Sequence, residues 1–325
     1  AALGDEAFLP PSRSDAHALF AFEEIVAAPV TWQFGARYER NRLASPGLSS
    51  RREGELSGSL GAVWQLDDQH SLALSVAHTG RAPNAQELLA YGAHAGTQSF
   101  EIGDASLDPE RSLGLEASLR RKKGFVTGAV TLFAHRFSGY IFARPTGLVA
   151  IEHGGEWEFI LADDPHAEAH GGGLPVYRSA QSDARFWGVE VETIWHLHES
   201  RGAQLDVRLA ADLTRAQESG RNLPRIPAAR TTAGITWATA NWSVGAECQF
   251  VFDQNRIAAN ETSTDGYTLA SAHVSRSFEF EHLHFDAFLR GTNLTNAEVR
   301  PHTSFVKDLA PLAGRGVVAG VRLSF

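Results

Sequence analysis

The sequence predicts an all-β protein whose fold class is a transmembrane antiparallel up-and-down β-barrel. Three observations predict this fold: side chains alternate between apolar and polar along many segments, connections are short and long in turn, and charges gather on one face of the strands. The last segment, 315–325, shows the alternation. One of its faces is apolar, with Val317, Ala319, Val321, Leu323 and Phe325, and the other is small or polar. A repeat of two residues is that of a strand, because successive side chains point to opposite faces.

About thirteen segments share this pattern, which is typical of strands. We expect them at 15–26, 30–40, 56–65, 71–79, 110–120, 125–143, 176–197, 205–213, 228–237, 242–253, 267–278, 283–294 and 315–325. The long connections fall at 43–54, 80–109, 145–173, 217–227, 254–265 and 295–314, and a short turn lies between each long connection and the next. Bacterial outer-membrane barrels have short periplasmic turns and longer outside loops. The strict alternation therefore favours such a barrel over a soluble β-sandwich.

Charged side chains recur on the face opposite the apolar one. They are Arg37, Glu39, Glu190, Glu192, Asp206, Arg208, Asp212, Glu247, Asp286, Arg290 and Arg322. Each would cost several kcal/mol in the core of a sandwich unless it were paired, whereas a lumen with water tolerates them. Tryptophans on the apolar face are expected to form an aromatic girdle. They are Trp32, Trp64, Trp187, Trp195 and Trp242.

Composition excludes several classes of function. No apolar run reaches about 18 residues, which excludes an ordinary transmembrane helix. The net charge of -9 and the absence of a basic stripe predict no nucleic-acid partner. Cys248 is the one cysteine, so the chain can form no internal disulfide. A structural zinc site with several cysteine ligands is disfavoured for the same reason. Neither GxSxG nor HExxH occurs, so we predict that the protein is not an enzyme.

Several ordered motifs along the chain resemble those of one known family. They are GRAPNAQELLAYGAHAGTQSFEIGDASLDPERS at 80–112, SGYIFARPTG at 138–147, LPVYRSAQSDARFWGVEVE at 174–192, NLPRIPAARTTAGITW at 222–237 and the closing stretch 290–325. With these motifs the chain resembles the C-terminal part of the β-barrel of a TonB-dependent outer-membrane receptor. The resemblance extends over nearly the whole sequence.

The resemblance implies a location, partners and a domain plan. Such transporters close with about 22 strands around a plug, so residues 1–325 are expected to be the C-terminal part of the barrel, without the N-terminal plug domain, the first strands or the signal peptide. The first strand would then be an open edge. The expected location is the outer membrane of a Gram-negative bacterium, as a monomer in outer-membrane lipid. The TonB inner-membrane energising complex would be reached through the N-terminal region.

The implied function is TonB-energised uptake of a scarce nutrient. The segment 301–315 (PHTSFVKDLAPLAGR) and the loops with histidines most resemble the branch that takes up zinc or related metals. Two alternatives stay open within the barrel class: a passive pore or truncated non-transporting barrel, and a siderophore or haem receptor of the same family. A barrel enzyme with a lumenal serine or histidine is the least favoured alternative. We expect no resident cofactor, and zinc or another transition metal, free or as a chelate, would be cargo.

The loop 145–173 holds the densest group of metal-ligating side chains. The candidates there are His153, Asp163, Asp164, His166, Glu168 and His170, and other loops add His94 and His302. Imidazole and carboxylate groups are suitable ligands for Zn²⁺. The alternative is an acidic, histidine-rich loop that is simply solvated.

Overall fold

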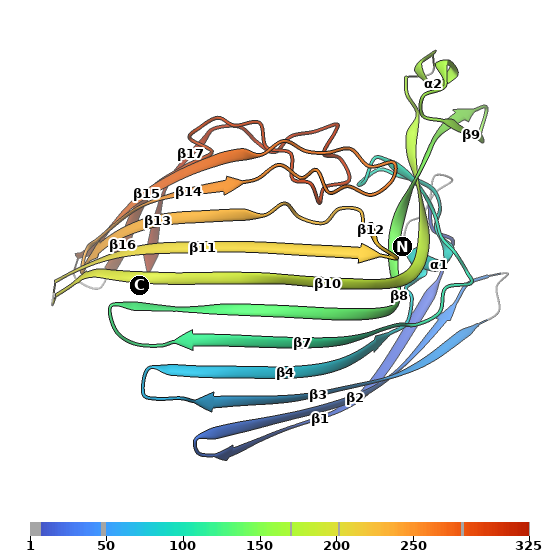
Figure 1. Ribbon diagram of the computed structural model, residues 1–325. Helices are drawn as coiled ribbons and strands as arrows, with labels where there is room; N and C mark the ends of the chain where they lie inside the picture. The colour runs from blue at the N-terminus through green and yellow to red at the C-terminus, as the bar shows by residue number, and fades with distance from the viewer. Residues whose placement is uncertain (1–7, 47–49, 170, 201, 281–282, 325) are drawn as a thin grey trace.

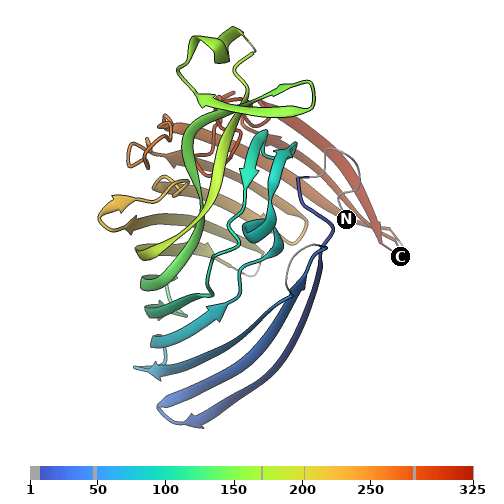
Figure 2. The same ribbon diagram turned by 90° about the vertical axis from the view of Figure 1, so that its right-hand side faces the viewer.

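The computed structural model describes residues 8–46, 50–169, 171–200, 202–280 and 283–324. The described strands form a single 17-stranded sheet, which curves like an open trough (Figures 1 and 2). The long strands are β1 (Arg13–Ala27), β2 (Val30–Ala44), β3 (Arg51–Gln65), β4 (His70–Arg81), β7 (Glu110–Arg121), β8 (Val126–His153), β10 (Leu174–Glu199), β11 (Ala203–Glu218), β13 (Arg230–Thr239), β14 (Trp242–Val251), β15 (Tyr267–Phe280), β16 (Leu283–Thr292) and β17 (Gly316–Ser324). These long strands correspond one to one to the predicted segments.

The remaining elements are short and belong to the connections. They are α1 (Ala85–Leu89), β5 (Tyr91–His94), β6 (Ser99–Ile102), β9 (Glu156–Leu161), α2 (Pro165–Ala169) and β12 (Arg221–Asn222). Neither described helix is long or apolar enough to cross a membrane. Long connections lie at one end of the sheet and short turns at the other (Figure 1), as the alternation of connection lengths predicts.

Each long strand pairs antiparallel with the next long strand along the chain. The ladder between β8 and β10, for example, places Val126 opposite Trp195 and Phe142 opposite Ala180. Among the described residues, β1 pairs with β2 and β17 with β16. Figure 2 shows the blue strand β1 and the red strand β17 at opposite margins of the sheet. The first strand is therefore an edge here, as expected.

The two faces of the sheet differ as predicted. Large apolar side chains stay exposed on one face, and Trp187 (51 % exposed) and Val321 (69 %) are examples. The opposite face carries ion pairs between strands. Arg208 on β11 lies 2.7 Å from Glu192 on β10 and 3.4 Å from Glu247 on β14. Charges on this face therefore compensate one another across strands, which lowers the free energy of placing them in a lumen.

Two predicted loops were too long. The connection predicted at 43–54 is only 45–50, because β2 and β3 pair as far as Leu43 opposite Arg51. The segment predicted to be irregular at 145–173 contains the end of β8, all of β9 and α2. Both errors have one physical reason. Strands that extend beyond a bilayer need no apolar face, so the alternation that reveals them in sequence is lost.

The long connection from β4 to β7 begins with a fixed helix. Asn84 accepts a hydrogen bond from the Glu87 amide at 2.9 Å, and the Glu87 carboxylate accepts one from the Asn84 amide at 2.8 Å. This reciprocal capping satisfies two amides that the helix α1 leaves without partners. Glu87 also pairs with Arg81 at the end of β4 at 2.9 Å. The short helix α1 is therefore tied to the sheet.

Candidate metal centre on the arm between β8 and β10

The end of β8 continues beyond the sheet and forms an arm with β9 and α2. We call residues 148–169 the arm, and Figure 1 shows it projecting beyond the other loops. The hairpin of β8 and β9 pairs Leu148 with Leu161 and His153 with Glu156. Gly154 and Gly155 form its turn with φ of 62° and 90°. Two consecutive residues with positive φ are typical of the tight turns that connect paired strands, and glycine adopts them without strain.

A small apolar core holds α2 against the hairpin. Val149, Ile151 and Ala167 are buried together, and Ile160 packs against them. At the start of α2, the Asp164 carboxylate accepts a hydrogen bond from the His166 amide at 2.9 Å. The short helix therefore has a fixed place on the arm, and its first turn carries His166 over the hairpin.

Three side chains of the arm bring their ligand atoms together. His153 Nε2 lies 3.6 Å and His166 Nε2 lies 3.9 Å from Glu158 Oε2. The three ligand atoms all lie within 4.8 Å of one another. The two imidazole rings are 5.9 Å apart between centroids, and the three side chains are 41 %, 48 % and 52 % exposed for His153, His166 and Glu158. They are thus accessible from solvent.

Two imidazoles and one carboxylate form a common ligand set for transition metals. Zinc–nitrogen and zinc–oxygen bonds of about 2.0–2.2 Å place tetrahedral ligand atoms roughly 3.3 Å apart. The spacing between ligand atoms on the arm is somewhat longer, so binding requires a contraction that exposed side chains achieve by rotation. Three protein ligands leave a position for water or for a group of a chelator. The same set also suits copper, nickel and iron.

Sequence reasoning found two of these three residues. His153 and His166 were predicted, but Glu158 was missed because it lies within the alternating segment of β9 and resembles an ordinary strand residue. The register pairs Glu158 with Ile151, two residues before His153 on the same face. A prediction that paired 148–153 with 156–161 as a hairpin would have placed Glu158 beside His153.

The other predicted ligands lie apart from this group or beyond the described residues. Asp164 caps α2, while Asp163 and Glu168 are exposed on the arm. His170 lies outside the described residues. His94 stacks on Phe8 with ring centroids 4.2 Å apart and contacts the Glu101 carboxylate at 2.7 Å.

His302 belongs to a buried polar cluster that joins two loops. We call Glu261, His302 and Lys307 the loop cluster; their side chains are 5 %, 1 % and 6 % exposed. Glu261 lies 3.2 Å from His302 Nε2 and 3.5 Å from Lys307 Nζ. Burial raises the pKa of Glu261, but its contacts with His302, two backbone amides and Lys307 outweigh this and lower the pKa to about 2. Burial lowers the pKa of Lys307.

The family described as "TonB dependent receptor-like, beta-barrel" matches residues 3–294. The chain belongs to this family. The family is described as receptor-like, which agrees with the prediction that the protein is not an enzyme.

Solved structures of the same architecture are similar to the chain. The copper transporter OprC matches with a TM-score of 0.72 and 17 % identity over 95 % of this chain and 48 % of its own. The FrpB iron transporter from Neisseria meningitidis matches with a TM-score of 0.65 and 15 % identity over 96 % of this chain and 46 % of its own. The siderophore receptor PirA from Acinetobacter baumannii matches with a TM-score of 0.58 and 14 % identity over 96 % of this chain and 55 % of its own. The chain thus spans about half the length of these proteins, and at such identities the likeness concerns the fold.

Proposed function

We propose that this chain is the barrel part of an outer-membrane receptor that captures a metal ion or metal chelate and takes it up with energy from the TonB complex. Family membership supports the class of protein. The observation that carries the choice of cargo is the group His153, Glu158 and His166, whose ligand atoms lie within 4.8 Å of one another on the arm. In the orientation of bacterial barrels, this arm belongs to the outside loops, since short turns face the periplasm.

Zinc is the first choice of cargo. The imidazole and carboxylate donors of the arm match the ligands that Zn²⁺ takes in proteins. Copper binds the same donors more tightly as a rule, and a structurally similar protein is named a copper transporter. Ligand atoms must lose their protons to bind a metal, so acidification is expected to weaken capture. The role of these side chains is to bind the metal outside the barrel and to hold it above the lumen.

Calorimetric titration of the purified full-length receptor with zinc, and separately with copper, tests this site. We expect one saturable site. The substitutions His153→Ala, His166→Ala and Glu158→Gln should each weaken binding at least about tenfold, which corresponds to about 1.4 kcal/mol. Asp163→Asn is the matched control, because it removes a nearby exposed carboxylate outside the group and should leave the affinity unchanged. Equal affinity in all variants, or no binding, would contradict metal capture by the arm.

A siderophore receptor is the second candidate, because the similar structures include the siderophore receptor PirA. Such a receptor would bind a ferric chelate and show no saturable binding of free zinc. A passive pore would pass ions without any requirement for TonB. The zinc titration distinguishes a siderophore receptor from a receptor that captures the metal itself. Measurement of uptake with and without TonB distinguishes a passive pore from an energised receptor.

A further inference from the structure

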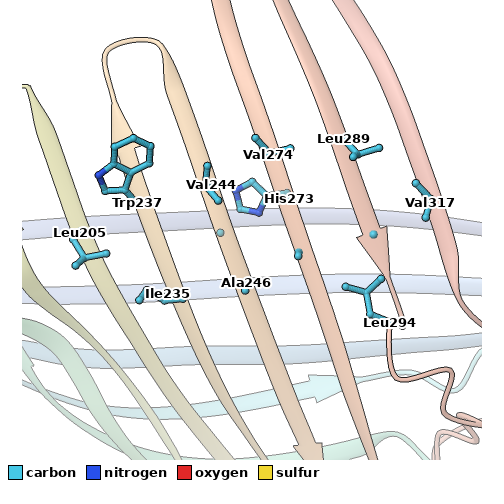
Figure 3. A pocket seen from close by; sticks show the side chains of 13 residues that line it. Leu205, Ile235, Trp237, Val244, Ala246, His273, Val274, Leu289, Leu294 and Val317 are labelled. Carbon is cyan, nitrogen blue, oxygen red and sulfur yellow. The ribbon is translucent and has the colours of Figure 1, made fainter.

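An apolar groove crosses the sheet from β11, where Leu205 lines it, to β17 (Figure 3). Its volume is about 570 Å³. The strand register places Ala246 opposite Ala272 and Ala272 opposite Gly291. Three neighbouring strands therefore have only small residues side by side at this position. Ile235 and Trp237 form one wall, and Leu289, Leu294 and Val317 form the other. The groove is therefore a hollow with large apolar side chains on both sides.

The groove opens on the apolar face of the sheet. Val317 pairs with Gly291 and Leu289 with Ala319, which places the groove on the face of the alternating apolar residues of β17. The opposite face of the same strands carries Asp286 and Arg322 as a register pair. In a barrel of this family, the apolar face contacts lipid. The occupant of the groove must therefore come from the membrane.

Arg276 lies beside the groove, two residues beyond the lining residue Val274 on β15. Because of this spacing it shares the apolar face, and it is opposite Trp242 on β14. Its guanidinium lies 4.9 Å from the ring centroid of Trp242 and 4.5 Å from that of Phe278. The side chain is exposed, and within the part of the chain that the structure describes no carboxylate pairs with it. The rings hold the cation by cation–π attraction and leave its N–H groups available for an anion.

The depth of Arg276 suits a lipid headgroup. Arg276 is opposite Trp242, which is the first residue of β14 after the short turn from β13. An arginine on the lipid face costs about 2–4 kcal/mol at the bilayer midplane but about 0–1 kcal/mol near the interface. This arginine lies toward the short-turn end of the sheet, which faces the periplasm in bacterial barrels.

We propose that this surface binds one anionic phospholipid of the periplasmic leaflet, with the phosphate group on Arg276 and an acyl chain in the groove. Arginine recognises phosphate through paired N–H···O bonds. Surrounding lipid is as apolar as the groove, so the groove contributes shape and Arg276 contributes the preference for negative charge. This inference depends on the fold and on these side chains, and it is independent of the identity of the cargo.

Native mass spectrometry of the full-length receptor tests the proposal. The receptor would be incubated with an equal mixture of phosphatidylglycerol and phosphatidylcholine that have the same acyl chains. We expect one retained phosphatidylglycerol in preference to phosphatidylcholine. Arg276→Gln should reduce this preference about tenfold, which corresponds to about 1.4 kcal/mol. Arg136→Gln is the matched control, because it removes an exposed arginine that lies near Ser219 and Gly220, toward the long connections, and it should leave the preference unchanged.

A second variant tests the groove separately from the charge. Ala272→Leu fills the hollow while Arg276 stays in place, and we expect it to abolish retention of the lipid. Equal retention of the two lipids by the unaltered receptor, or retention that both variants leave unchanged, would overturn the proposal. A receptor dimer that Ala272→Leu dissociates would also overturn it, because a second copy of the chain would then cover the groove.

Discussion

Replacement of Glu261 by alanine is expected to release three long loops from one another while the strands stay folded. Glu261 accepts hydrogen bonds from the Arg225 amide at 2.7 Å and from the Ala258 amide at 2.9 Å. It also lies next to His302 and Lys307. One carboxylate thus joins the loops that follow β11, β14 and β16.

The expected loss of loop stability is large because Lys307 would remain buried without the carboxylate that pairs with it. Removing one partner of a buried ion pair typically costs about 3–5 kcal/mol. Hydrogen exchange should therefore become much faster at the amides of 219–229, 252–266 and 293–315. Glu298→Ala is the control, since Glu298 is 65 % exposed in its pair with Arg300 and should change stability by no more than about 0.5 kcal/mol. Unchanged exchange in Glu261→Ala, or equally faster exchange throughout β14–β16, would contradict this account of the loop cluster.

Acid should reproduce the effect of the substitution. The pKa of Glu261 is lowered from 4.5 to about 2 in the folded protein. A lowered pKa means that the unfolded loops bind the proton more tightly, so the stabilisation is fully present above pH 4.5 and is lost as the pH falls toward about 2. The loops should exchange faster through this window in the unaltered receptor. In Glu261→Ala the contribution of this group to the pH dependence should be absent.

Gly128→Ala is expected to have the second large effect, this time on the sheet itself. Gly128 lies opposite Thr193 in the ladder of β8 and β10. Its φ is 152°, and an added Cβ would clash with the Glu192 carbonyl oxygen and would lie 2.8 Å from the Thr193 Cα atom. These obstacles are backbone atoms, which cannot move without opening the ladder.

At Gly128 the free-energy costs of backbone strain and of overpacking add. Unfavourable backbone angles cost about 1–3 kcal/mol, and overpacking costs about 1–3 kcal/mol, so we expect a loss of roughly 3 kcal/mol or more. Urea unfolding of the receptor in lipid vesicles, followed by tryptophan fluorescence, measures this loss. Gly202→Ala is the matched control, because an added Cβ there meets nothing within 4 Å. Equal stability of the two variants would contradict the close approach of β8 and β10.

Much of the barrel could be predicted from sequence because its signals are local. Alternation identifies a strand without knowledge of its partner, and the apolar set of β17 lies on one face as predicted. The pair Asn84 and Glu87 is likewise a local signal, and it starts α1. Strand ends beyond the membrane carry no such signal, which explains why the end of β8 was predicted to belong to a long connection.

The candidate site depends on contacts that local patterns do not contain. His153 and His166 could be recognised by residue type, but Glu158 joins them only through the register of the β8–β9 hairpin and the packing of Ala167 beneath α2. His302 lies in different surroundings. Its residue type predicts a ligand for metal, whereas tertiary packing surrounds it with Glu261, Thr264 and Lys307.

The most direct test of TonB-energised metal uptake is the accumulation of radioactive zinc by cells that carry the full-length receptor. At low external zinc, we predict accumulation that falls to the level of cells without the receptor when TonB is deleted. The combined substitution of His153 and His166 by alanine should lower accumulation at least about tenfold, as expected for the loss of about 1.4 kcal/mol or more of binding free energy. Accumulation that is independent of TonB, or no accumulation above that of cells without the receptor, would contradict the proposed function.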